Sequence, residues 1–103
     1  MHIVIFVTAS SKKEAQKIAA GLIGRKLAAC VNIVDKIDSL FFWEGKIQKA
    51  KESLLIIKSK KDKMLKIIKL VKDLHSYKVP EIIALPVISG DKSYLRWIDA
   101  ALR

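Results

Sequence analysis

The order of strand-like and helix-like apolar patterns along the chain constrains its fold more than any other feature. Four stretches have the continuous or alternating apolar character of strands, at residues 3–8, 27–37, 47–58 and 81–88. Apolar residues recur at helical spacing behind Ser11, again from Lys60 to Leu74, and a last time after Gly90-Asp91. This order predicts the α+β class, as a ferredoxin-like βαββαβ sandwich with an additional C-terminal helix, in a single domain over residues 1–103.

Local signals assign positions within this fold. Ser11 and Glu14 have the spacing of a capping box, in which the Ser11 hydroxyl accepts from the Glu14 backbone and the Glu14 carboxylate reaches back to the cap. Gly45 marks the turn of a long hairpin whose tip is aromatic on one arm and basic on the other. Pro86 argues that the last strand lies at an edge or that its pairing ends there, and the apolar run from Ile3 suits a buried central strand.

A sandwich of this kind leaves one face of its sheet without helices. The hairpin carries too many apolar and aromatic residues for that face to lie bare in water, because large exposed apolar patches usually mark interfaces. Self-association through the sheet is the simplest way to cover it. The sequence therefore predicts an oligomer.

The formal charge of +10 is large for 103 residues. The segment from Lys46 to Lys78 contains eleven lysines and only three acidic residues. Such a concentration of positive charge could attract nucleic acid, acidic lipid or an anionic small molecule. The alternative is a solvated lysine face whose alkyl stems cover apolar surface. Without aromatic or glycine-rich reading elements, the pattern disfavours nucleic acid as a partner.

Other features bear on the compartment. No apolar run approaches the roughly 18 residues that span a bilayer, and the N-terminal segment has the pattern of a strand rather than of a signal peptide. A single cysteine cannot form an internal disulfide, which fits a reducing environment. We therefore expect a cytoplasmic protein without membrane spans.

The stretch Leu74–Ile83 holds the densest polar chemistry of the chain. His75 is either a metal ligand or a helix-end histidine that bonds the last helical carbonyls, and one histidine does not make a metal motif. Glu81 begins an apolar strand, so its carboxylate must be paired, hydrogen-bonded or open to a cleft. Tyr77 and Lys78 are close enough in sequence to satisfy it.

Two further residues have both a functional and a structural interpretation. Cys30 is either a ligand or nucleophile or, with its apolar neighbours, a small core residue. Trp43 could stack on a planar ligand or anchor an interface. The motifs of hydrolases, nucleotide-binding loops and zinc sites are missing, and the sequence offers no catalytic machinery.

Four segments resemble the landmarks of one known family, the CutA divalent-cation tolerance proteins. In chain order they are Lys26-Leu27-Ala28-Ala29-Cys30-Val31-Asn32, Phe42-Trp43-Glu44-Gly45-Lys46, Leu74-His75-Ser76-Tyr77-Lys78-Val79-Pro80-Glu81-Ile82, and Tyr94-Leu95-x-Trp97. The resemblance implies a ferredoxin-like protomer in a tight, PII-like homotrimer. It also implies a non-enzymatic, cytoplasmic role in the tolerance of copper and other divalent metals.

The same resemblance implies where a ligand binds. Clefts between subunits would hold a metal such as Cu²⁺ or a small ligand, lined by six residues: Cys30, Trp43, His75, Tyr77, Lys78 and Glu81. Val7 and Leu74 stand where bacterial members with an assigned copper site have ligands, so His75 is the one predicted metal ligand. The similarity to PII proteins and the lysine-rich segment keep an alternative open, a sensor that binds an anionic metabolite or nucleotide.

Overall fold

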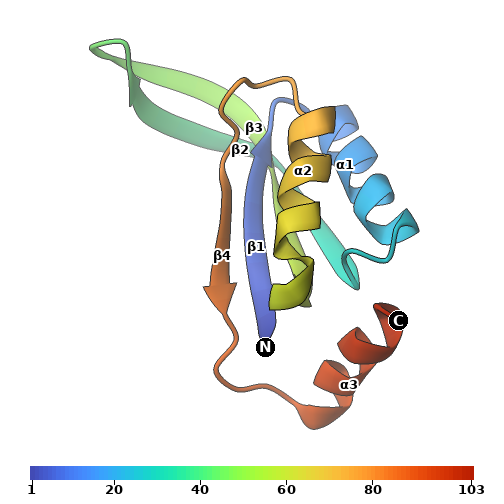
Figure 1. The fold of residues 1–103 in the computed structure, drawn as a ribbon. Helices are drawn as coiled ribbons and strands as arrows, with labels where there is room; N and C mark the ends of the chain where they lie inside the picture. Colours follow the sequence, from blue (N-terminus) through green and yellow to red (C-terminus); the bar gives the residue numbers. More distant parts are fainter.

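The structure, a computed structural model, describes all residues from Met1 to Arg103 (Figure 1). Its elements are β1 (His2–Ala9), α1 (Lys12–Gly24), β2 (Cys30–Trp43), β3 (Lys46–Lys60), the 3₁₀ turn η1 (Lys61–Lys63), α2 (Met64–Leu74), β4 (Ile82–Pro86) and α3 (Lys92–Ala101). The predicted βαββαβ order with a C-terminal helix is therefore confirmed.

The four strands form one antiparallel sheet in the order β2-β3-β1-β4. Val7 of β1 lies opposite Leu55 of β3 on one side and Ile82 of β4 on the other. The predictions of a central first strand and an edge position for the strand that ends in Pro86 are both confirmed. Pro86 is tolerated there because an edge strand needs hydrogen bonds on one side only.

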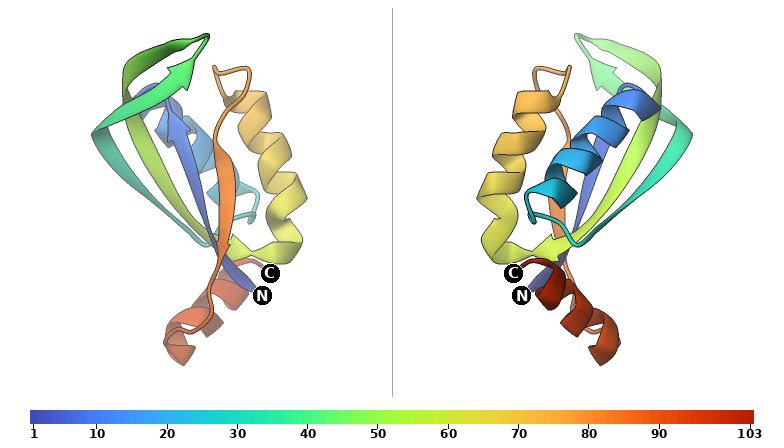
Figure 2. Two further views of the ribbon diagram at one scale, coloured as in Figure 1. Left: turned by 90° about the vertical axis from the view of Figure 1, so that its left-hand side faces the viewer. Right: turned by 90° about the vertical axis from the view of Figure 1, so that its right-hand side faces the viewer.

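Both long helices cover the same face of the sheet (Figure 2). Successive side chains of a strand point to opposite faces, so every second residue of β1 lies beneath the helices. The residues buried in this layer include Ile5, Val7, Leu55, Ile57, Ile18, Leu22, Ile67 and Val71. Burial of each large aliphatic side chain contributes about 1.5–3 kcal/mol, so this layer is a large apolar contribution to the stability of the fold.

The other face of the sheet has no covering element. Strand alternation directs Val4, Phe6, Ile83, Leu85 and Val34 to it, and the last three are about half exposed. The predicted open apolar face is thus present. Its closure by other copies stays a prediction.

The hairpin of β2 and β3 projects beyond the helices (Figure 1). A β-bulge interrupts its register between Val34 and Ile37, where Lys36 adopts a left-handed φ of 58° and the Asp35 carboxylate accepts from Ser53 Oγ at 2.7 Å. Large apolar side chains remain exposed near its tip, and these are Leu40, Phe41, Phe42, Trp43 and Ile47.

Helix α3 is attached to the start of the sheet by a few contacts. Ile98 and Leu102 are buried, and the Asp99 carboxylate lies 2.8 Å from His2 Nε2 and 3.4 Å from Lys60 Nζ. No helix in the structure has both the length and the apolar character needed to cross a membrane.

Candidate functional site

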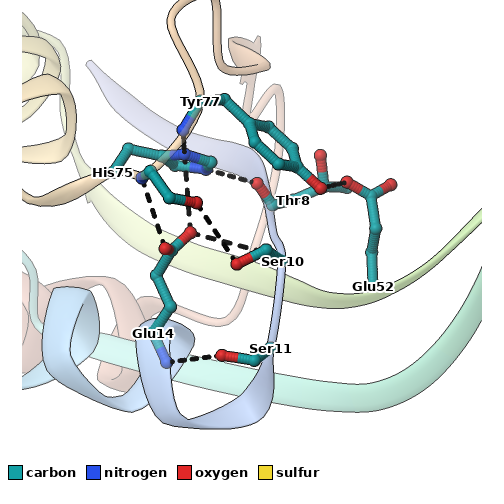
Figure 3. A network of polar contacts seen from close by, with 8 residues as sticks. Thr8, Ser10, Ser11, Glu14, Glu52, His75 and Tyr77 are labelled. Carbon is teal, nitrogen blue, oxygen red and sulfur yellow. Dashed lines mark hydrogen bonds and ion pairs between the residues drawn. The ribbon is translucent and has the colours of Figure 1, made fainter.

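The imidazole of His75 is the centre of a polar network between α2 and β1 (Figure 3). Its side chain is fully buried, with Nε2 2.7 Å from the carbonyl oxygen of Thr8 and Nδ1 3.0 Å from the backbone nitrogen of Tyr77. A carbonyl can only accept and a backbone N–H can only donate, so Nε2 carries the proton and Nδ1 accepts. The ring bonds a strand carbonyl rather than the last carbonyls of α2, which corrects the helix-end interpretation.

Glu14 of α1 faces the same network. Its carboxylate accepts from the backbone N–H of Ser10 at 3.3 Å and of Ser76 at 3.2 Å, and lies 3.5 Å from His75 Nδ1. Burial acts to raise the pKa of Glu14, but the hydrogen bonds from Ser76 and Ser10 outweigh it and lower that pKa. Glu14 therefore ties the loop after α2 to the start of α1.

This arrangement corrects half of the predicted capping box. The Ser11 hydroxyl does accept from the Glu14 backbone, at 3.1 Å. The Glu14 carboxylate, however, makes its hydrogen bonds to Ser10 and Ser76 instead of returning to the Ser11 backbone. The capping pattern gave Glu14 a local role only, because a partner 62 residues away leaves no trace in sequence spacing.

Tyr77 and Glu52 form the second half of the network. The Tyr77 hydroxyl donates to Glu52 Oε2 at 2.8 Å (Figure 3). Glu52 lies on β3 and is 7% exposed. Burial, then the hydrogen bond to Glu52 and its charge, raise the pKa of Tyr77 to about 12. Sequence reasoning missed Glu52, although a lone carboxylate next to the apolar run of β3 was a usable signal.

Glu81 lies immediately before β4 and near Glu52. Burial and then the charge of Glu52 raise the pKa of the Glu81 carboxyl group. The expectation that Tyr77 or Lys78 satisfies Glu81 is wrong, because the Tyr77 hydroxyl bonds Glu52 and Lys78 forms no ion pair. No lysine or arginine nitrogen lies within 4.0 Å of either Glu52 or Glu81.

The other predicted site residues lie elsewhere in the chain. Cys30 lies on β2 opposite Lys58, and Thr8 lies on β1 opposite Leu54. The two positions are four residues apart along β3, about 13 Å in the strand direction, so Cys30 is remote from the network. Its half-buried thiol lies beside Tyr94 of α3, whose pKa is raised by burial and by that neighbour.

Trp43 is at the hairpin tip, opposite Lys46, and its indole nitrogen donates to Glu44 at 2.8 Å. Lys78 is exposed in the loop between α2 and β4. One chain thus brings His75, Tyr77 and Glu81 together and leaves Cys30, Trp43 and Lys78 apart from them.

A divalent metal can be tested against these donors. No group of three or more histidine, cysteine or carboxylate side chains is close enough to hold an ion. Ligation by His75 would break its hydrogen bond to Thr8 or to Tyr77. The residues of one chain therefore do not complete a metal site, since metal centres use at least three protein ligands.

The fold and this network define a small ferredoxin-like protein with an open sheet face and a polar corner between α2 and β4. The profile of one family, described as CutA1 divalent ion tolerance protein, matches residues 3–101. The chain belongs to this family.

Individual relatives agree with the assignment. The chloroplastic CutA 1 protein of rice is 45% identical over 98% of this chain, which spans 57% of the length of the rice protein. The divalent-cation tolerance protein CutA of Yersinia pestis is 42% identical over 97% of this chain and 84% of its own length.

Solved structures show the same fold. The periplasmic divalent cation tolerance protein CutA from Archaeoglobus fulgidus is 46% identical, with a TM-score of 0.97 over 100% of both chains. Cut A1 from Thermus thermophilus is 41% identical, with a TM-score of 0.94 over 95% of each chain. The ferredoxin-like assignment is therefore confirmed.

Proposed function

We propose that this chain acts in divalent-cation tolerance as a non-enzymatic, cytoplasmic homotrimer. It would hold a divalent metal such as Cu²⁺, or a small ligand, in clefts between subunits. The observation that carries this proposal is the pair of carboxylates, Glu52 and Glu81, without a cationic partner in a chain of charge +10. Carboxylates kept apart from so many lysines favour a cation from outside the subunit.

The incomplete donor set supports a shared site. Two carboxylates are too few for a stable metal centre, so further ligands must come from water, from the bound molecule or from another copy. The half-exposed Ile83 and Leu85 on the open sheet face favour self-association, which would bring another copy near β4. The PII-like trimer is the arrangement that we propose.

Each residue of the site then has a distinct role. Glu81 and Glu52 would face the cation, and the Tyr77 hydroxyl orients Glu52. His75 holds the loop through its buried hydrogen bonds. Direct ligation by His75 is the competing assignment, and it requires one of those hydrogen bonds to break. Trp43 would reach the cleft from the hairpin of another copy and form a wall.

Calorimetric titration with Cu²⁺ tests the metal assignment. Binding by wild type should weaken at least about tenfold in Glu81→Gln, because a charged ligand is replaced by a neutral one. Asp62→Asn, which removes an exposed carboxylate on η1, is the matched control and should bind like wild type. Equal binding by wild type and Glu81→Gln would remove Glu81 from the site, and equal binding by His75→Ala would reject ligation by His75.

An anionic metabolite or nucleotide is the second candidate ligand. The exposed and unpaired Lys78, next to Tyr77 and three residues before Glu81, is the observation that favours it. Thermal shifts across a panel of nucleotides and organic acids distinguish this sensor from a metal-binding protein. No shift with any compound of the panel would reject it.

A further inference from the structure

We propose that the helical layer carries a separate binding site for a small phosphate-bearing dianion, in a hollow between the end of α1 and one side of α2. The hollow has a volume of about 270 Å³ and is lined by Arg25, Leu27, Lys66, Lys69, Leu70 and Asp73. Nothing in the proposed metal function requires it.

The floor of this hollow is rigid. Leu27 and Leu70 are 7% and 5% exposed and belong to the buried core, so they cannot move without disturbing the packing between helix and sheet. An apolar floor with polar groups at its rim is the usual composition of a small-molecule site.

The rim of the hollow is held by backbone structure. Arg25 caps the C-terminus of α1, and its N–H donates to Gly21 at 3.2 Å. Lys26 then turns the chain back with a φ of 56°, and Leu27 N–H donates to Leu22 at 2.9 Å. Lys66 and Lys69 are one helical turn apart on α2, so both project from the same side of that helix.

The charges of the lining match a dianion. Three cationic side chains face one carboxylate, that of Asp73, which lies 3.2 Å from Lys69. Arg25 and Lys66 have no ion-pair partner. The net charge of +2 equals the charge that a phosphate monoester brings at neutral pH, about −1.5 to −2. Arg25 adds a planar fork of donors that suits phosphate oxygens.

Size and position narrow the ligand further. The volume is below the roughly 300–1,000 Å³ of sites for drug-sized molecules, which suits a phosphate group with a small organic substituent. The lining shares no residue with the network of His75, and Arg25 is eleven residues from Glu14, about 16 Å along a helix, so the two sites are distinct. It lies in the helical layer, where an assembly through the open sheet face would leave it accessible.

A competing explanation assigns Arg25 and Lys26 a structural role only. Cationic residues near a helix C-terminus stabilise the helix dipole, and this would account for their position in α1. That role predicts no saturable binding of an anion.

The test is a titration of the full chain with inorganic phosphate and with glycerol 3-phosphate, followed through backbone amide resonances at low salt. We expect saturable shifts at residues 25–27 and 66–70. Arg25→Gln and Lys66→Gln should each weaken binding about tenfold, since each removes a charged hydrogen bond to the ligand. Lys17→Gln on α1 and Lys72→Gln on α2 are matched controls with the same charge change outside the hollow.

The pattern of losses decides the outcome. Weakening confined to Arg25→Gln and Lys66→Gln supports the site, and tighter binding of glycerol 3-phosphate than of phosphate shows that the hollow accepts an organic substituent. Equal weakening in all four variants, or shifts spread over all exposed lysines, would mean general attraction of anions and would overturn the proposal.

All four substituted residues lie at the surface, so each variant should remain folded, and thermal unfolding checks this. Because the hollow shares no residue with the carboxylate pair, these results are independent of the Cu²⁺ titration.

Discussion

The hydroxyl group of Tyr77 donates a hydrogen bond to Glu52 Oε2 at 2.8 Å and so joins the loop after α2 to β3, 25 residues earlier in the chain. The Glu52 carboxylate has no other hydrogen-bond or ion-pair partner. The position of this carboxylate therefore depends on one phenol.

Replacing Tyr77 by phenylalanine isolates that bond. Hydrogen bonds to charged groups contribute about 1.5–3 kcal/mol, and we expect the free energy of unfolding of Tyr77→Phe to fall by that amount at neutral pH. Urea unfolding at fixed protein concentration measures it. Tyr94→Phe, which removes a hydroxyl from the half-exposed Tyr94, should change stability by less than about 0.5 kcal/mol. A similar decrease in the free energy of unfolding in both variants would show that the hydrogen bond to Glu52 does not stabilise the fold.

His75→Ala should destabilise the chain more than Tyr77→Phe. The change leaves the Thr8 carbonyl and the Tyr77 N–H without partners in a buried site, at a cost of about 2–4 kcal/mol. It should also release the loop that follows, so limited proteolysis ought to cleave near residues 76–81 first. His2→Ala, which breaks the surface contact to Asp99, serves as the control. An uncleaved loop in His75→Ala would contradict the anchoring role.

The lowered pKa of Glu14 predicts how stability depends on pH. A carboxyl group whose pKa is depressed by folding contributes stability above its ordinary value, 4.5, and loses that contribution as the pH falls through the folded value. Wild type should therefore be more stable than Glu14→Gln at pH 7, with the gap closing below about pH 4.5. Melting temperatures from pH 2.5 to about 7 measure the gap. A constant gap over that range would show that the charge of Glu14 is not the cause.

Glu81 should behave in the opposite way. Its pKa is raised, so its ionised form opposes folding, fully so above the folded pKa and not at all below the ordinary value of 4.5. Glu81→Gln is therefore expected to melt at a higher temperature than wild type at pH 7 and at the same temperature near about pH 3. Added divalent metal should stabilise wild type alone, so that at neutral pH wild type melts at a higher temperature than Glu81→Gln. A variant less stable than wild type without metal would refute the repulsion between Glu81 and Glu52.

The open face of the sheet predicts which substitutions alter assembly. Ile83→Asp places a charge on that face, and light scattering should show monomer in place of the proposed trimer. Leu65→Asp makes the same chemical change at a residue 82% exposed on α2 and should leave the mass unchanged. If Ile83→Asp keeps the mass of wild type, copies do not meet through this face.

Much of the fold followed from patterns that act over short distances. The continuous apolar run of β1 predicted its central position, Pro86 predicted the edge position of β4, and the placing of both long helices on one face of the sheet predicted the open apolar face. These features are predictable because each depends on neighbouring residues and on strand period.

The polar network could be predicted only in part. His75, Tyr77 and Glu81 are adjacent in sequence and were found, whereas Glu14 and Glu52 join them through the packing of α1 and β3. Cys30 stayed apart because antiparallel pairing put it at the far end of β3. Contacts of this kind join elements that are far apart in the chain, and local sequence spacing does not show which of them pack together.

The bulge between Val34 and Ile37 also determines which face of the hairpin each side chain beyond it occupies. Because β2 gains one residue there, Phe41 and Trp43 share a face with Glu52, while Leu40 and Phe42 point the other way. Deleting Lys36 would exchange the faces occupied by these two pairs of side chains. It would not alter the helix-covered core, because this part of the hairpin lies beyond the helices. The chain would keep its fold, but Leu40 and Phe42 would replace Phe41 and Trp43 on the face that includes Glu52.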